Sequence, residues 1–149
     1  MKIIFLDIDG VLNSSTGKGP YESDMETEKI ILLKKLIDEA SVDGVVISSD
    51  RRYSKIDMSH KKKIFDFYQM KIVGYTRRPK DIFDDPDDNR GKQIMDYLCC
   101  SNDGIDKMLI LDDNDDGISN IFPEVFIKTN SVYGFNADVY NDSLRILNN

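Results

Sequence analysis

Short apolar runs are spaced along the chain and are separated by helical or turn-rich segments. They cover residues 2–8, 44–49, 71–76, 107–111 and 125–129. Each run is nearly continuous rather than alternating, and most of its residues are β-branched or otherwise bulky and apolar. This pattern is typical of a parallel strand that is buried on both faces. The sequence therefore predicts a mainly parallel, five-stranded sheet.

Helical periodicity appears between these runs. The predicted helices cover residues 25–40, 59–68, 91–100 and 137–147. In the first of them Ile30, Leu33 and Ile37 recur at helical spacing, and Asn136 is suited to cap the last. Because strands alternate with helices, we expect βαβ units with helices on both faces of the sheet. This is a three-layer α/β fold, expected to form one domain over residues 1–149.

Charge and cysteine content narrow the class of protein. The chain has 27 acidic and 20 basic residues and a net charge of −7, which argues against general nucleic-acid binding because that needs a basic face. Local basic patches remain at residues 51–52 and 77–78. No apolar run approaches the ~18 residues of a membrane helix. The adjacent cysteines Cys99 and Cys100 are poorly placed to bridge each other. We expect a cytoplasmic protein without a membrane segment, in an oligomeric state that the sequence leaves open.

Acidic residues follow two of the predicted strands. Asp7 and Asp9 end the first strand, and Asp112 and Asp113 end the fourth. Ligands of open α/β sheets bind at the carboxyl ends of the strands, where these acids should meet. Residues two apart in an extended chain point the same way, and neighbouring carboxylates repel unless a cation lies between them. Oxygen ligands without histidine or thiol suit Mg²⁺.

These acids lie in segments that resemble the motifs of the haloacid dehalogenase (HAD) superfamily of phosphotransferases. Residues 5–13 are similar to the first motif, an apolar strand followed by Asp-x-Asp-Gly. Residues 45–48 are similar to the second motif, and residues 110–113 to the fourth motif in its paired-acid form. Arg90 and Lys92 are two candidates for the basic residue of the third motif. The resemblance implies the Rossmann-like fold of this superfamily.

A closer resemblance is to the small HAD domains of multidomain "Swiss Army Knife" RNA repair proteins. Shared features are the Val-Gly-Tyr-Thr strand at residues 73–76, the Arg-Gly-x-x-Ile helix start at residues 90–94 and the Leu-Asp-Asp turn. That group usually has Ser-Ser-Ser-Trp-Arg after the second strand. This chain has Ser-Ser-Asp-Arg-Arg at residues 48–52, so it lacks the tryptophan.

The resemblance implies a catalytic role for several motif residues. Asp7 would attack phosphorus and form an aspartyl-phosphate, which divides one displacement into two easier ones. Asp9 would act as general acid and then as general base. Ser48 would hold a non-bridging oxygen. Arg90 or Lys92 would neutralise charge on the equatorial oxygens.

The resemblance also implies a metal site and its surroundings. Mg²⁺ would lie between Asp7, the backbone carbonyl of Asp9 and Asp113. Asp112 would pair with the basic residue of the third motif, and Asp116 would support the site from further out. Candidates for substrate contact share a position just beyond a strand end: Gly10, Ser49, Arg51, Arg52, Arg77 and Arg78. For the arginines, phosphate recognition and simple surface solubilisation both remain open.

The spacing between motifs leaves no room for a folded cap domain. Residues 14–25 can form only a short flap, and residues 53–89 are used by a helix, a strand and an acidic loop at 81–89. An uncapped site is open to bulky substrates. The leading hypothesis is a Mg²⁺-dependent phosphohydrolase acting on nucleotides or on the phosphate ends of polynucleotides. The alternative is a non-catalytic HAD-like domain that binds phosphate or a partner. A receiver domain fits poorly, because the third strand ends without an aspartate.

Overall fold

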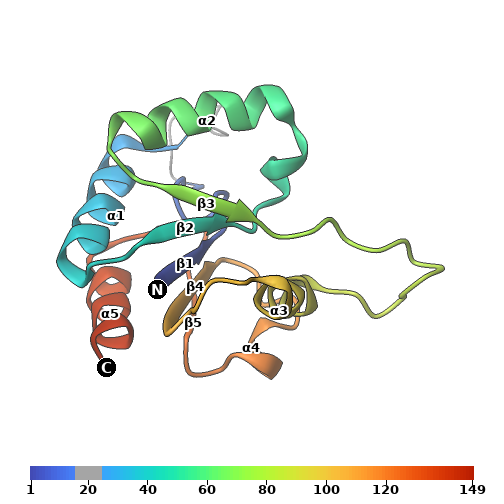
Figure 1. The fold of residues 1–149 in the computed structure, drawn as a ribbon. Helices are drawn as coiled ribbons and strands as arrows, with labels where there is room; N and C mark the ends of the chain where they lie inside the picture. Colours follow the sequence, from blue (N-terminus) through green and yellow to red (C-terminus); the bar gives the residue numbers. More distant parts are fainter. Residues whose placement is uncertain (16–24) are drawn as a thin grey trace.

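A parallel five-stranded sheet forms the centre of the protein (Figure 1), whose computed structural model describes residues 1–15 and 25–149. The strands are β1 (Lys2–Leu6), β2 (Gly44–Ile47), β3 (Ile72–Tyr75), β4 (Lys107–Asp112) and β5 (Phe126–Lys128). Their order across the sheet is β3-β2-β1-β4-β5, and each neighbouring pair is parallel. The predicted sheet is confirmed, and β1, which carries the first acidic motif, lies in its middle.

Helices cover both faces of the sheet. They are α1 (Thr27–Ala40), α2 (Lys55–Phe67), α3 (Arg90–Cys100), α4 (Ile118–Ile121) and α5 (Ala137–Asn148), with a 3₁₀ helix η1 (Asp50–Tyr53). One core joins Ile4 and Leu6 of β1 to residues of α1, α2 and α5. The other joins Ile3 and Phe5 to residues of α3 and α4. Alternate residues of β1 thus enter different cores, which explains its continuous apolar run and confirms the three-layer, Rossmann-like fold (Figure 1).

Two local features differ from the sequence prediction. Helix α2 begins at Lys55, four residues before the predicted start at 59, because the Ser54 side chain accepts a hydrogen bond from the backbone N–H of Asp57 and caps the helix. The first turn of this helix alternates charged and apolar residues, Lys55-Ile56-Asp57-Met58, so helical periodicity does not detect it. The short elements η1 and α4 were not predicted. The expected cap of α5 is confirmed, since the Asn136 side chain accepts from the N–H of Val139.

Within the described residues no cap domain is inserted. From β2 to α3 the chain contains only η1, α2, β3 and the loop that extends away from the sheet between β3 and α3 (Figure 1). The flap expected at residues 14–25 falls mostly outside the described residues. Across residues 1–15 and 25–149, none of the helices combines the length and the apolar character that crossing a membrane would need.

Candidate active site

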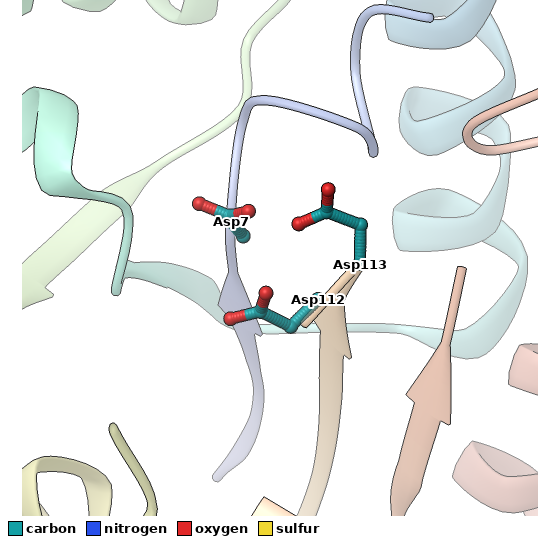
Figure 2. Close-up of side chains that lie close together, drawn as sticks. All are labelled: Asp7, Asp112 and Asp113. Carbon is teal, nitrogen blue, oxygen red and sulfur yellow. The ribbon is translucent and has the colours of Figure 1, made fainter. Parts of the chain in front are cut away.

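Three carboxylates meet at the carboxyl ends of β1 and β4. Asp7 directly follows β1, Asp112 is the last residue of β4 and Asp113 follows it. The backbone N–H of Asp7 donates to the carbonyl of Leu111 at 2.9 Å, so the parallel pairing of the two strands fixes the relative position of these acids. One carboxylate oxygen from each of the three lies within 4.8 Å of the others, and Figure 2 shows them gathered at this edge.

The crowding of these acids has an electrostatic cost. Asp7 and Asp112 are buried and Asp113 is half-buried. Burial, followed by the neighbouring charge of Asp112, raises the pKa of Asp7 to about 8 even though Arg90 opposes the shift. Burial likewise raises the pKa of Asp112. A divalent cation would relieve this repulsion, and a donor set made only of carboxylate oxygens fits Mg²⁺.

Arg90, the first residue of α3, is the cation nearest to Asp7 among the described residues. Its Nη1 lies 2.6 Å from Asp112 Oδ2 and 3.4 Å from Asp7 Oδ1, and its Nη2 lies 3.1 Å from Asp50 Oδ1. Burial alone would lower the pKa of Arg90, but Asp112 and Asp7 outweigh it and raise the pKa. The guanidinium therefore stays charged and is held at the acid cluster.

Lys92, the other sequence candidate for this cation, lies elsewhere. Its Nζ is 3.6 Å from Asp85 Oδ2 in the acidic loop, and its side chain is 42% exposed. Arg90 and Lys92 are two residues apart on α3, and residues at this spacing point in different directions from a helix. Of the two candidates, only Arg90 has an ion pair with Asp7 and Asp112.

The acids of β4 and the following turn have different partners. Asp112 uses both carboxylate oxygens, since Oδ2 binds Arg90 and Oδ1 accepts from the backbone N–H of Asn114 at 3.0 Å. Among the described residues, Asp113 has no ion pair with a basic side chain. Asp116 Oδ2 accepts from the backbone N–H of Arg90 at 3.0 Å, so it fixes the start of α3.

Asp9 is separate from the three-carboxylate cluster. Its carboxylate accepts hydrogen bonds from Arg51 Nε and Nη2, both at 2.8 Å, and from Asn13 Nδ2 at 2.9 Å. Partial burial would raise the pKa of Asp9, but the bonds from Arg51 and Asn13 outweigh it and lower the pKa. Arg51 also lies 3.5 Å from Asp57 of α2. The Asp9 side chain is thus directed toward η1 and α2.

The turn after Asp9 depends on a glycine. Gly10 has a φ of 77°, and a Cβ at this position would lie 2.3 Å from Asp113 Oδ2. Its N–H donates to Asn13 Oδ1 at 2.8 Å, and its carbonyl accepts from the Thr129 hydroxyl at 2.8 Å. Sequence reasoning gave no role to Asn13 or Thr129. The position of Thr129, the last residue of the fifth predicted strand, was a signal that could have found it.

Two buried serines follow β2. Ser48 is 0% exposed, its N–H donates to the carbonyl of Leu6 at 3.0 Å, and its hydroxyl has no hydrogen-bond partner among the described residues. A buried hydroxyl without a partner is uncommon in folded proteins and is well suited to accept or donate to a ligand. Ser49 instead caps η1, because its hydroxyl accepts from the N–H of Arg51.

Arg52 was expected on the surface, either for phosphate recognition or for solubility, but the structure buries it. Its side chain is only 2% exposed. The guanidinium donates to the backbone carbonyls of Ser48, Ser49, Thr76 and Arg77 and to the side chains of Gln93 and Asp50. It therefore joins the ends of β2 and β3 to α3, and its donors are used within the protein.

Arg77 is bound to side chains of the protein, whereas Arg78 is exposed. Arg77 binds Asp88 through two hydrogen bonds, at 2.9 and 2.7 Å, and Asp96 at 2.6 Å. The bond to Arg77 holds the pKa of Asp88 below its usual range and ties down the acidic loop. Arg78 is exposed, and its guanidinium carbon lies 5.1 Å from the centre of the Tyr53 ring.

The parallel sheet with paired acids beyond β1 and β4 places the chain in the HAD superfamily of phosphohydrolases. More specifically, the family model described as the HAD domain in Swiss Army Knife RNA repair proteins matches residues 3–139, so the chain belongs to this family. The resemblance seen in the sequence motifs is therefore confirmed. Searches of curated proteins and of solved structures gave no match.

Proposed function

We propose that this chain is a Mg²⁺-dependent phosphatase, a phosphoric monoester hydrolase that works through an aspartyl-phosphate on Asp7. The observation that carries this proposal is the acid cluster, in which oxygens of Asp7, Asp112 and Asp113 lie within 4.8 Å of one another. Arg90 Nη1 lies 3.4 Å from Asp7 Oδ1. A carboxylate nucleophile can approach a phosphate only where positive charge screens their repulsion. The acid cluster offers a binding place for a divalent cation that would supply this charge, beside the guanidinium of Arg90.

Asp7, Asp113 and the backbone carbonyl of Asp9 are the proposed holders of the ion, which would supply that screening charge. Arg90 is fixed by Asp112 and would neutralise negative charge on the equatorial oxygens of the transferred phosphoryl group. The unpartnered Ser48 hydroxyl would bind a non-bridging oxygen. With the phosphate held in this way, an oxygen of Asp7 attacks phosphorus, and the bond to the leaving oxygen breaks.

Asp9 is the proposed proton carrier of both steps. It gives a proton to the leaving oxygen and later removes one from the water that hydrolyses the aspartyl-phosphate. In the structure Arg51 and Asn13 bind both oxygens of this carboxylate. Arg51 must therefore release at least one of them before Asp9 can carry a proton to the substrate.

The proposed substrates are nucleotides or the phosphate ends of polynucleotides. Two observations support this class. The family to which the chain belongs is described by its occurrence in RNA repair proteins. In addition, the described residues contain no cap domain, so a bulky phosphorylated end is not obstructed by one. We propose that residues 1–149 perform this function as a single domain.

Phosphate release from an aryl phosphate, nucleoside monophosphates and 3′- and 5′-phosphorylated oligoribonucleotides tests the proposal. Turnover should require Mg²⁺ and stop in EDTA. Asp7→Asn should abolish it, because the amide is nearly isosteric but cannot act as an anionic nucleophile. Asp142→Asn is the matched control, since Asp142 is exposed on α5 and should not matter.

Two results would contradict the proposal. The first is substantial turnover by Asp7→Asn. The second is a wild-type chain that is stabilised by phosphorylated ligands but releases no phosphate from any of them, which would favour the non-catalytic binding domain.

A further inference from the structure

The four arginines beyond β2 and β3 do not share one role. Arg51 is bound to Asp9 and Asp57, Arg77 is bound to Asp88 and Asp96, and the side chain of Arg52 is buried. Arg78 differs, because its guanidinium forms no hydrogen bond or ion pair with any other described residue. It is exposed, and its guanidinium lies over an aromatic ring. It is therefore the one of these four whose donors are open to a ligand.

That ring belongs to Tyr53, the last residue of η1. The guanidinium carbon of Arg52 lies 4.3 Å from the ring centre, and that of Arg78 lies 5.1 Å from it. Arg52 is fixed by its bonds to four carbonyls, so it holds the ring in place from the protein side. Arg78 thus presents a planar cation on a rigid aromatic support. Planar guanidinium groups and aromatic rings are the surfaces on which unpaired bases stack.

This support is next to the acid cluster. Asp7 follows β1, Ser48 follows the neighbouring β2, and Thr76 at the end of β3 donates its N–H to the carbonyl of Ile47. Arg78 comes two residues after Thr76. Two strand spacings, about 10 Å, separate the ends of β1 and β3. A ligand whose terminal phosphate lies at Asp7 and which extends across β2 would therefore reach Arg78 with its next nucleotide.

We propose that Tyr53 and Arg78 form a subsite that binds the nucleotide adjacent to the terminal phosphate of a single-stranded polynucleotide. This inference rests on the proposed function and assigns a position to the second nucleotide. Arg78 donates to the phosphodiester that follows the terminal nucleotide, and the adjoining base stacks on the Arg78–Tyr53 pair. Arg77 and Arg52 take no part, because their donors are already used within the protein.

A phosphopeptide is the other large ligand with a terminal or isolated phosphate. The stacked pair favours the polynucleotide, because every base offers a flat face whereas most peptide side chains do not. The acidic surface of the chain confines any such contact to this patch, so a modest and local effect is expected.

Binding is measured by fluorescence anisotropy with the full chain carrying Asp7→Asn, which prevents turnover, in Mg²⁺ buffer. The probes are a single-stranded oligoribonucleotide labelled at one end and phosphorylated at the other, in both polarities. A phosphorylated mononucleotide and a phosphopeptide serve as competitors. Arg78→Ala should weaken binding of one phosphorylated oligomer about tenfold, which is the size of one base-stacking contact. It should also reduce the salt dependence of binding by about one counterion.

Matched variants separate the subsite from net charge and from folding. Arg145→Ala removes another exposed arginine, on α5, and should leave binding unchanged. Tyr53→Phe keeps the ring and should bind like the parent, whereas Tyr53→Leu should lose affinity. Circular dichroism of each variant verifies that the fold is retained.

The proposal is overturned if Arg78→Ala and Arg145→Ala weaken binding equally. It is also overturned if the mononucleotide or the phosphopeptide competes more strongly than an unlabelled phosphorylated oligomer. These results are distinct from failure of the proposed function. A wild-type chain that releases no phosphate contradicts the phosphatase, whereas active turnover with an Arg78→Ala variant that binds normally contradicts only the subsite.

Discussion

Arg90 should be among the largest single contributors to stability in this chain. In the metal-free protein, Arg90→Met should lower the free energy of unfolding by about 3–5 kcal/mol, the range for removing one partner of a buried ion pair. Asp112 is 0% exposed and would lose a partner 2.6 Å away, and Asp7 would lose one 3.4 Å away. Such a loss is a large share of the roughly 5–15 kcal/mol that holds a typical domain folded.

The physical reason can be tested with a second substitution. If the cost comes from an uncompensated charge on Asp112, then Asp112→Asn introduced together with Arg90→Met should restore part of the stability. We expect a coupling free energy of about 2–3 kcal/mol between the two positions, at the upper end for residues in direct contact. Asp50 also contacts Arg90, but it is exposed, so water can replace its partner at little cost.

Urea unfolding at pH 7 in EDTA, followed by circular dichroism, gives these free energies, provided that the m-value is unchanged among the variants. Arg145→Met is the control, because its ion pair with Asp142 is exposed and should contribute less than about 1 kcal/mol. A cost of less than 1 kcal/mol for Arg90→Met, or a double variant no more stable than the single one, would refute the assigned role of the buried pair.

Three further predictions follow from the site and its surroundings. Asp113→Ala should weaken Mg²⁺ binding in calorimetric titrations more than Asp112→Ala, because both carboxylate oxygens of Asp112 already accept hydrogen bonds, from Arg90 and Asn114. The reverse order would make Asp112 the metal ligand in place of Asp113. Gly10→Ala should destabilise the chain by about 1–3 kcal/mol in urea unfolding, because Gly10 has a positive φ and an added Cβ would lie only 2.3 Å from Asp113. Gly104→Ala is the control and should be close to neutral, because the space around Gly104 is open. The pKa of Asp88 is lower in the folded protein than the value of about 3.9 expected in the unfolded chain. Its ion pair with Arg77 therefore stabilises the fold fully above pH ~3.9, and this stabilisation is lost progressively as the pH falls below that value. The gap in urea midpoint between wild type and Asp88→Asn should therefore narrow from pH 7 to pH 3, and a constant gap would contradict this.

Most of the fold could be read from the sequence because buried parallel strands have a simple pattern. The run at residues 2–8 is continuously apolar since Ile3 and Phe5 enter one core while Ile4 and Leu6 enter the other. Helix starts were harder to place. Met58 is the one buried residue in the first turn of α2, so the start of the helix depends on a capping hydrogen bond that periodicity does not detect.

The acid cluster was predictable for a topological reason. Strands β1 and β4 are adjacent and parallel, so residues that follow them must meet at the same edge. The sequence predicted that Asp112 pairs with Arg90 or Lys92 but left the choice between them open, because that choice depends on the direction of a side chain. Arg90 and Lys92 differ by two helix positions, yet one binds Asp112 and the other Asp85.

The two arginines of the pentapeptide after β2, Arg51 and Arg52, have different structural roles. At residues 48–52 this chain keeps the serine pair and the final arginine of the Swiss Army Knife pattern but lacks its tryptophan. Arg52 is 2% exposed and binds carbonyls from the ends of both β2 and β3, so a residue without several planar donors would leave buried carbonyls unpaired. Arg51 stands where the family pattern has tryptophan. It is 22% exposed and contacts the side chains of Asp9 and Asp57, so a change at this position alters the surroundings of Asp9 without breaking the link between the strands. The change at position 51 therefore alters the surroundings of the proposed proton carrier, whereas Arg52 holds the two strand ends together.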